Sequence, residues 1–134
     1  VEVVPAGTEG VEHAVGQVLA RLFADGVSVS DVAIVSLAGQ TRTQLARASL
    51  VAGYRVVRAD ADDAPRCVVA DTFLRFKGLE RPFIVVVEPG LALGDRYDRR
   101  MHIALTRATA GVVVVAEPDA LAADVRLAGL LQAS

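Results

Sequence analysis

The sequence predicts one three-layer α/β domain built on a mostly parallel sheet of about five or six strands. Short, unbroken runs of β-branched residues recur along the chain, and such runs are typical of strands covered on both faces. Amphipathic stretches with helical spacing lie between several of these runs. Strands that alternate with helices form parallel sheets with right-handed crossovers. A length of 134 residues suits one domain with its own core.

The apolar runs give the expected strands. Aromatic residues make up only 4% of the chain, so Val, Leu, Ile and Ala must build the core. The runs that predict strands are "VEVV" at the start, then 32–35, 54–57, 67–70, 83–87 and 111–115.

The first helix is predicted from Val11, because the apolar residues that follow it fall on one stripe at i, i+3 and i+4 spacing. Thr8 is the expected N-cap and Gly26 the expected C-terminal stop. Further helices are predicted over 41–51, over 97–108 and from Pro118, a residue favoured in the first helical turn.

One connection departs from the alternation of strands and helices. The segment "RADADDAPR" (58–66) joins two expected strands. It is too short for a crossover helix, because a parallel β–α–β connection needs about a dozen residues or more. Either the strands at 54–57 and 67–70 are antiparallel, or a segment normally inserted here is missing.

Composition limits the classes of partner. A formal net charge of −2 excludes a polybasic nucleic-acid binder, so any phosphate contacts must come from local basic clusters. No apolar run approaches the roughly 20 residues that span a bilayer, so no membrane partner is expected. The lone Cys67 cannot form an internal disulfide, which suits the cytoplasm, and we expect a buried, inert thiol.

The common catalytic constellations are missing from the sequence. His13 and His102 lack metal-ligand spacing, so no metal site is predicted. The chain has no Gly-x-Ser-x-Gly elbow, no dinucleotide-binding glycine motif and no phosphate-binding Gly-x-x-x-x-Gly-Lys-Ser/Thr loop. By itself it has no recognisable means of holding a triphosphate.

Two polar segments beside buried strands could bind a ligand. In 71–87, a polar bend follows one strand and precedes another, and ligands bind at the carboxyl ends of strands in open α/β sheets. Gly78 would let the backbone turn tightly beside a ligand. On composition alone, an ordinary loop of mixed charge is the favoured interpretation.

The second segment is the predicted helix 97–108. Arg107 lies beside the apolar stripe on this helix and shares a flank with Arg100. A cation at a helix C-terminus adds roughly 0.3–1 kcal/mol of stability, which is one interpretation. The other is a guanidinium that reaches a phosphate held by a neighbouring domain.

Together the two segments resemble a known family. "TFLRFKGLE" (72–80) resembles motif V of the UvrD/Rep-type superfamily 1 DNA helicases, whose core is Thr-x-His-x-x-Lys-Gly-Leu-Glu. "HIALTRATAGVVVV" (102–115) resembles their motif VI, and order and spacing also agree. A weaker similarity covers 31–45, which is similar to the strand and Gln-x-Arg segment earlier in the same domain.

The resemblance implies that residues 1–134 are the second RecA-like domain (2A, of the P-loop NTPase type) of a longer helicase. In that family the nucleotide lies between this domain and a first RecA-like domain, which supplies the phosphate loop and the magnesium ligands. The implied cofactors are ATP and Mg²⁺ in the full-length protein, with none expected in the isolated chain, which should be inactive alone. The implied partners are the first RecA-like domain and single-stranded DNA.

The resemblance also implies roles for particular residues. Arg107 would be the catalytic arginine finger at the γ-phosphate. Lys77, Gly78 and Glu80 would face ATP, with Glu80 on the ribose, and Arg42, Thr72 and Arg75 would face DNA.

Several positions differ from the family pattern. Leu74 replaces the motif V histidine, His102 replaces the motif VI tyrosine, and Arg81 stands where phenylalanine often follows Lys-Gly-Leu-Glu. The short connection falls where larger relatives insert their 2B subdomain, so that insertion is expected to be absent or replaced near 59–66. These differences favour an alternative, a helicase-derived DNA- or protein-interaction module without catalysis. A third alternative is a flavodoxin-like or receiver-like domain with a ligand pocket of its own.

Overall fold

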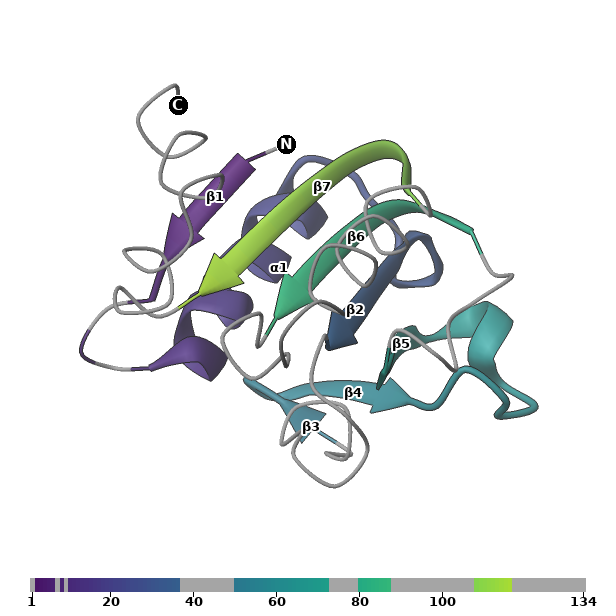
Figure 1. The fold of residues 1–134 in the computed structure, drawn as a ribbon. Helices are drawn as coiled ribbons and strands as arrows, with labels where there is room; N and C mark the ends of the chain where they lie inside the picture. The colour runs from purple at the N-terminus through teal and green to yellow at the C-terminus, as the bar shows by residue number, and fades with distance from the viewer. Residues whose placement is uncertain are drawn as a thin grey trace, which may run out of the picture.

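The computed structural model describes residues 2–6, 8, 10–36, 50–72, 80–87 and 108–116. In this part of the chain a seven-stranded sheet has the order β1-β7-β6-β2-β5-β4-β3 (Figure 1). All its pairings are parallel except that of β3 with β4. The strands are β1 Glu2–Pro5, β2 Val32–Ser36, β3 Leu50–Val51, β4 Tyr54–Val57, β5 Val68–Thr72, β6 Arg81–Val87 and β7 Ala108–Ala116.

The predicted α/β class and mostly parallel sheet are confirmed, and the architecture is consistent with a RecA-like fold. The strand number exceeds the predicted five or six because β3 adds a short edge strand. A two-residue turn, Ala52–Gly53, with φ of 50° and 88°, folds β3 back onto β4. Both positive φ values fit the type I′ turns that match the twist of a hairpin.

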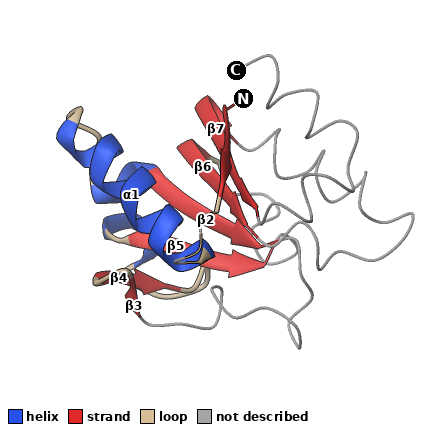
Figure 2. Cartoon of the chain, turned by 90° about the vertical axis from the view of Figure 1, so that its left-hand side faces the viewer, coloured by secondary structure: helices blue, strands red, loops and turns tan. Residues whose placement is uncertain are grey.

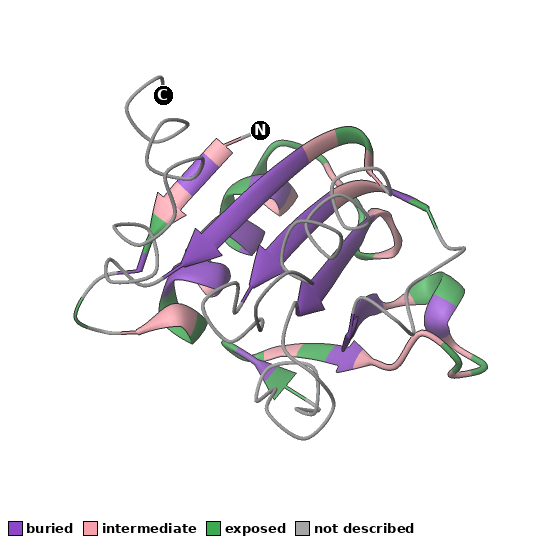
Figure 3. Ribbon diagram, in the orientation of Figure 1, coloured by how far each residue is buried: buried purple, intermediate pink, exposed green. Residues whose placement is uncertain are grey.

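The centre of the sheet is buried on both faces, as Figure 3 shows for β2, β6 and β7. All five residues of β2 are buried between β5 and β6. Successive side chains alternate between faces, so Val35 and Ile84 belong to one apolar cluster, and Ile34 and Val85 to the other. The unbroken apolar runs in the sequence reflect this two-sided burial.

Helix α1 (Val11–Ala24) covers one face of the sheet (Figure 2). Its buried stripe is Ala14, Val15, Val18, Leu19 and Leu22. Gly26 has φ of 96°, and the N–H groups of Gly26 and Val27 donate to the carbonyls of Phe23 and Leu22 at 3.1 Å. This pattern of bonds is a Schellman motif, and it confirms the predicted stop at Gly26.

Other predicted helix ends are wrong. The N-cap of α1 is Gly10, with φ of 97°, rather than Thr8. Val51, expected at the end of a helix, is in β3, and Ala108 is the first residue of β7 because it pairs with Arg81 of β6. The remainder of 41–49 and 97–107, and the helix expected from Pro118, lie outside the described residues.

β4 and β5 are parallel, with Val56 opposite Val68 and Val57 opposite Val69. The antiparallel alternative for these strands is therefore wrong. The connection makes successive tight turns, among them a 3₁₀ turn at Ala64–Arg66, rather than a crossover helix. No helix is needed because β4 has only four residues. The connection must therefore return over only about 13 Å to reach the start of β5. Whether larger relatives carry an insertion here stays a prediction.

Candidate functional site

The motif V and motif VI segments reach the sheet at the same edge. Arg81, which follows Glu80, begins β6, and its register partner in β7 is Ala108, which follows Arg107. Glu80 is exposed. Arg107 precedes Ala108 in the sequence and lies outside the described residues. We call the end of the sheet at which β6 and β7 begin the amino edge, and the end at which they finish the carboxyl edge. The two segments that the sequence analysis singled out therefore meet the sheet at its amino edge.

Thr72 lies at the opposite edge. It ends β5 and pairs with Ser36, which also pairs with Val87 at the end of β6. Glu80 lies seven positions before Val87, so it stands roughly 23 Å from Thr72 along the strand direction, at about 3.3 Å per residue. Thr72 does lie at the carboxyl end of a strand, as the sequence predicts, and its contact with a ligand stays a prediction. Glu80 belongs to the opposite end of the sheet, because β5 and β6 run parallel on either side of β2.

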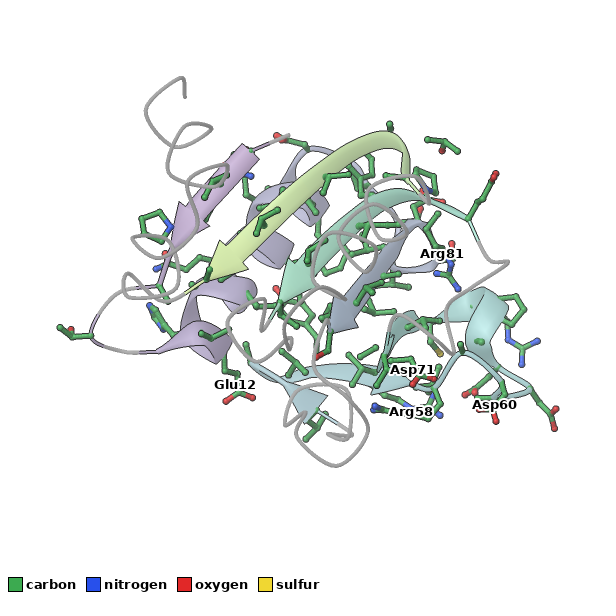
Figure 4. All side chains as sticks on the ribbon, viewed as in Figure 1. Glu12, Arg58, Asp60, Asp71 and Arg81 are labelled. Carbon is green, nitrogen blue, oxygen red and sulfur yellow. The ribbon has the colours of Figure 1, made fainter. Side chains whose placement is uncertain are left out.

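Thr72 and its neighbour Asp71 are each only 2% exposed. The Asp71 carboxylate accepts hydrogen bonds from the N–H groups of Ala59 at 3.0 Å and Thr72 at 2.8 Å (Figure 4). Asp71 thus links the end of β5 to the connection that follows β4. The Thr72 hydroxyl oxygen is buried without a hydrogen-bond partner among the described residues. Asp71 was not predicted, although an acid that interrupts the apolar run "VVAD" is a usable signal.

Arg81 is a buried cation at the amino edge, 9% exposed (Figure 4). Its Nη2 donates to the Ala64 carbonyl at 2.6 Å, and its Nη1 to the Cys67 carbonyl at 3.1 Å. Nη1 also donates to the carbonyl of Ser30 and, at 3.4 Å, to that of Val32. Burial lowers the pKa of the Arg81 guanidinium below its ordinary value, and the negative charge of Asp31 opposes that shift.

Arg81 also was not predicted as a site residue. The sequence shows it only as a difference from a family pattern, and its partners are main-chain carbonyls that leave no signal in a side-chain pattern. Of the predicted site residues, the structure describes Thr72 and Glu80. Arg42, Arg75, Lys77, Gly78 and Arg107 lie outside the described residues, and their roles stay predictions.

The remaining candidate groups are structural. Cys67 is half-buried rather than fully buried, because it precedes β5 on the exposed connection. Its Sγ lies 3.8 Å from Nη1 of Arg55 and from Oδ2 of Asp63. His13 is exposed on α1 with Gln17 at 3.1 Å. Across the described ranges no three His, Cys, Asp or Glu side chains gather as metal ligands, and no helix could cross a membrane.

The comparison with protein families gives one match. Residues 67–115 match the family described as UvrD-like helicase C-terminal domain. No curated protein matches the chain. The matched segment runs from the residue before β5 through β6 and into β7, so it contains both motif segments and the paired residues Arg81 and Ala108. The match confirms the predicted UvrD/Rep-type C-terminal domain over this segment.

Proposed function

We propose that this chain is the second motor domain of an ATP-dependent DNA helicase or translocase. It would supply an arginine finger to an ATP site shared with a first RecA-like domain. The observation that carries the proposal is the pairing of Arg81 with Ala108. That register brings the residue after Glu80 and the residue after Arg107 side by side on one edge of the sheet, within a segment that matches a helicase C-terminal domain.

The residues of the amino edge suit a half-site. Glu80 is exposed, so its carboxylate is free to accept hydrogen bonds from ribose hydroxyls. The sequence lacks a phosphate loop, so the phosphates and Mg²⁺ must be held by the partner domain. Mg²⁺ bound with ATP would neutralise part of the phosphate charge.

Arg107 would act when the two domains close. Its guanidinium would donate to the oxygens of the phosphoryl group being transferred, where negative charge develops in the transition state. Such a finger is worth on the order of 10³-fold or more in rate. Because the charge comes from across the cleft, hydrolysis would depend on domain closure.

Single-stranded DNA would lie at the other edge, where the buried Thr72 ends β5, with Arg42 and Arg75 as the contacts we propose. Along the strand direction, roughly 23 Å between Thr72 and Glu80 would separate the DNA-binding end of the sheet from the nucleotide-binding end. Domain closure at the amino edge would then move the carboxyl edge as part of one rigid sheet. Hydrolysis would be coupled to movement along DNA in this way.

The test uses the protein in which this chain is joined to a phosphate-binding first domain. Arg107→Ala is expected to lower kcat for ATP by about 10³-fold or more while nucleotide affinity changes little. The control is Arg21→Ala, an exposed arginine on α1 paired with Glu2. Equal loss of affinity and turnover, or turnover by the isolated 134-residue chain, would contradict the proposal. Binding of DNA without any ATP hydrolysis would identify a non-catalytic interaction module instead, which Leu74 favours.

A further inference from the structure

Arg81 joins the starts of three strands. Its own residue begins β6, the carbonyls of Ser30 and Val32 flank the start of β2, and those of Ala64 and Cys67 precede β5. One side chain therefore connects neighbouring strands at a single edge. A planar guanidinium with five N–H donors in a fixed fork suits such a set of carbonyls.

We propose that Arg81 is a positioning residue for the nucleotide edge, one that holds Glu80 and the start of β7 in place for catalysis. The inference rests on the proposed function. Glu80 is the residue immediately before Arg81, so a shift of the guanidinium moves Glu80 by way of one peptide unit. Ala108 pairs with Arg81, so the same shift reaches the residue bonded to Arg107.

Two differences from the family pattern come into contact here. The first is Arg81 itself, where the family often has phenylalanine. The second is the short connection between β4 and β5, whose residues Ala64 and Cys67 accept hydrogen bonds from Arg81. A phenylalanine has no side-chain donor for these carbonyls. Arg81 thus links the short connection by hydrogen bonds to β6, the strand that follows the motif V segment.

The register next to Arg81 adds to the argument for positioning. Between Arg81 and Phe83 of β6, β7 advances from Ala108 to Gly111, so β7 carries one extra residue. A bulge of this kind redirects the strand end and often lies beside an active site. Gly111 lies against the Phe83 ring, which a Cβ on Gly111 would meet at 3.4 Å. The bulge therefore lies between two register pairs of β6 and β7, Arg81 with Ala108 and Phe83 with Gly111.

The orientation of a catalytic group is sensitive to such an anchor, since a displacement of about 1 Å can cost on the order of 10²-fold in rate. In the full-length protein, Arg81→Met is expected to lower kcat for ATP by about 10²-fold at a temperature well below its unfolding transition. Arg81→Lys is expected to recover part of that loss, because a single ammonium has only three donors.

The matched control is Val18→Ala, which removes buried volume from α1. This helix supplies none of the carbonyls that accept hydrogen bonds from Arg81. The substitution destabilises the fold but leaves Arg81 and the carbonyls that accept its hydrogen bonds in place, so kcat is expected to stay at the wild-type value. If kcat of Arg81→Met equals that of Val18→Ala at matched stability, Arg81 is structural only and the inference is wrong. If Arg81→Met does not fold, Arg81→Lys decides, and an unchanged kcat in that variant overturns the inference.

Arg107→Ala in the same assay separates the two proposals. Full turnover in Arg107→Ala overturns the proposed function and the role of Arg81 with it. Loss of turnover in Arg107→Ala, with normal turnover in Arg81→Met, overturns only the positioning role. Loss in both variants, with Val18→Ala unaffected, supports both.

Discussion

Helix α1 rests on the β3–β4 turn through a contact that has no room for a methyl group. A Cβ added to Gly16 would lie 2.5 Å from the Cβ of Ala52, whereas carbon atoms in ordinary contact are about 3.5–4.0 Å apart. The turn is also tied to the helix by a hydrogen bond of 3.3 Å from the Ala52 N–H to Oε1 of Glu12, a residue labelled in Figure 4. Gly16→Ala must therefore push the helix and the turn apart by about 1 Å.

The magnitude follows from two opposed terms. Alanine gains up to about 1 kcal/mol over glycine in a helix interior. Overpacking in a well-packed contact costs about 1–3 kcal/mol, and α1 cannot slide away freely because its other face is buried on the sheet. We expect Gly16→Ala to lower the free energy of unfolding by up to about 2 kcal/mol, as measured by urea unfolding followed by circular dichroism.

A double-mutant cycle gives the sharper test. Ala52 has φ of 50°, so Ala52→Gly removes strain as well as the obstructing Cβ, and alone it should change stability by less than about 0.5 kcal/mol. In that background Gly16→Ala should stabilise by up to about 1 kcal/mol, the helix-propensity gain. The two changes are then coupled by the overpacking term, about 1–3 kcal/mol. Additive effects, or a stabilising Gly16→Ala in the wild-type background, would refute the reasoning.

Two further predictions concern the connection between β4 and β5. Asp71→Asn keeps the shape of the side chain but replaces one carboxylate oxygen with an NH₂ donor that faces an N–H group. The free energy of unfolding in urea should therefore fall by about 1–3 kcal/mol. An unchanged unfolding midpoint would mean that the hydrogen bonds from Ala59 and Thr72 contribute nothing to stability. Desolvation raises the pKa of Asp63, but the hydrogen bond from Arg55 at 2.6 Å, the charge of Arg55 and further hydrogen bonds together outweigh it and hold that pKa below its ordinary value. The stabilisation is therefore present above roughly pH 4 and lost as pH falls through the lowered pKa. Arg55→Met should raise the Asp63 pKa in an NMR titration, and an unchanged value would show that Arg55 is not the cause.

Much of the sheet could be predicted because burial on both faces leaves an unbroken apolar run. The run at Val32–Ser36 is a clear case. β3 was missed because Leu50 and Val51 also continue a helical pattern, and the turn that makes them a strand uses an alanine at positive φ, which sequence rules reserve for glycine or asparagine.

The sequence names candidate residues for the site, but it does not predict where they lie relative to one another. The motif segments name Thr72 and Glu80 as candidates, and those roles stay predictions. Their separation to opposite ends of the sheet follows from strand order, which depends on pairings between distant segments. Arg81 illustrates the limit best. Its partner carbonyls lie between 14 and 51 residues away in the sequence, and a carbonyl is the same at every residue.

The pairing of β1 with β7 joins the first strand of the described chain to the last, with Glu2 opposite Val113. During synthesis the pairing of β1 with β7 can therefore be completed only after residue 116 has left the ribosome. Contacts of such long sequence separation form slowly, because a large loop must close before they can form. Until β7 is made, β1 and one side of β6 lack their native neighbour, and such unpaired strand edges are where a nascent chain is prone to aggregate.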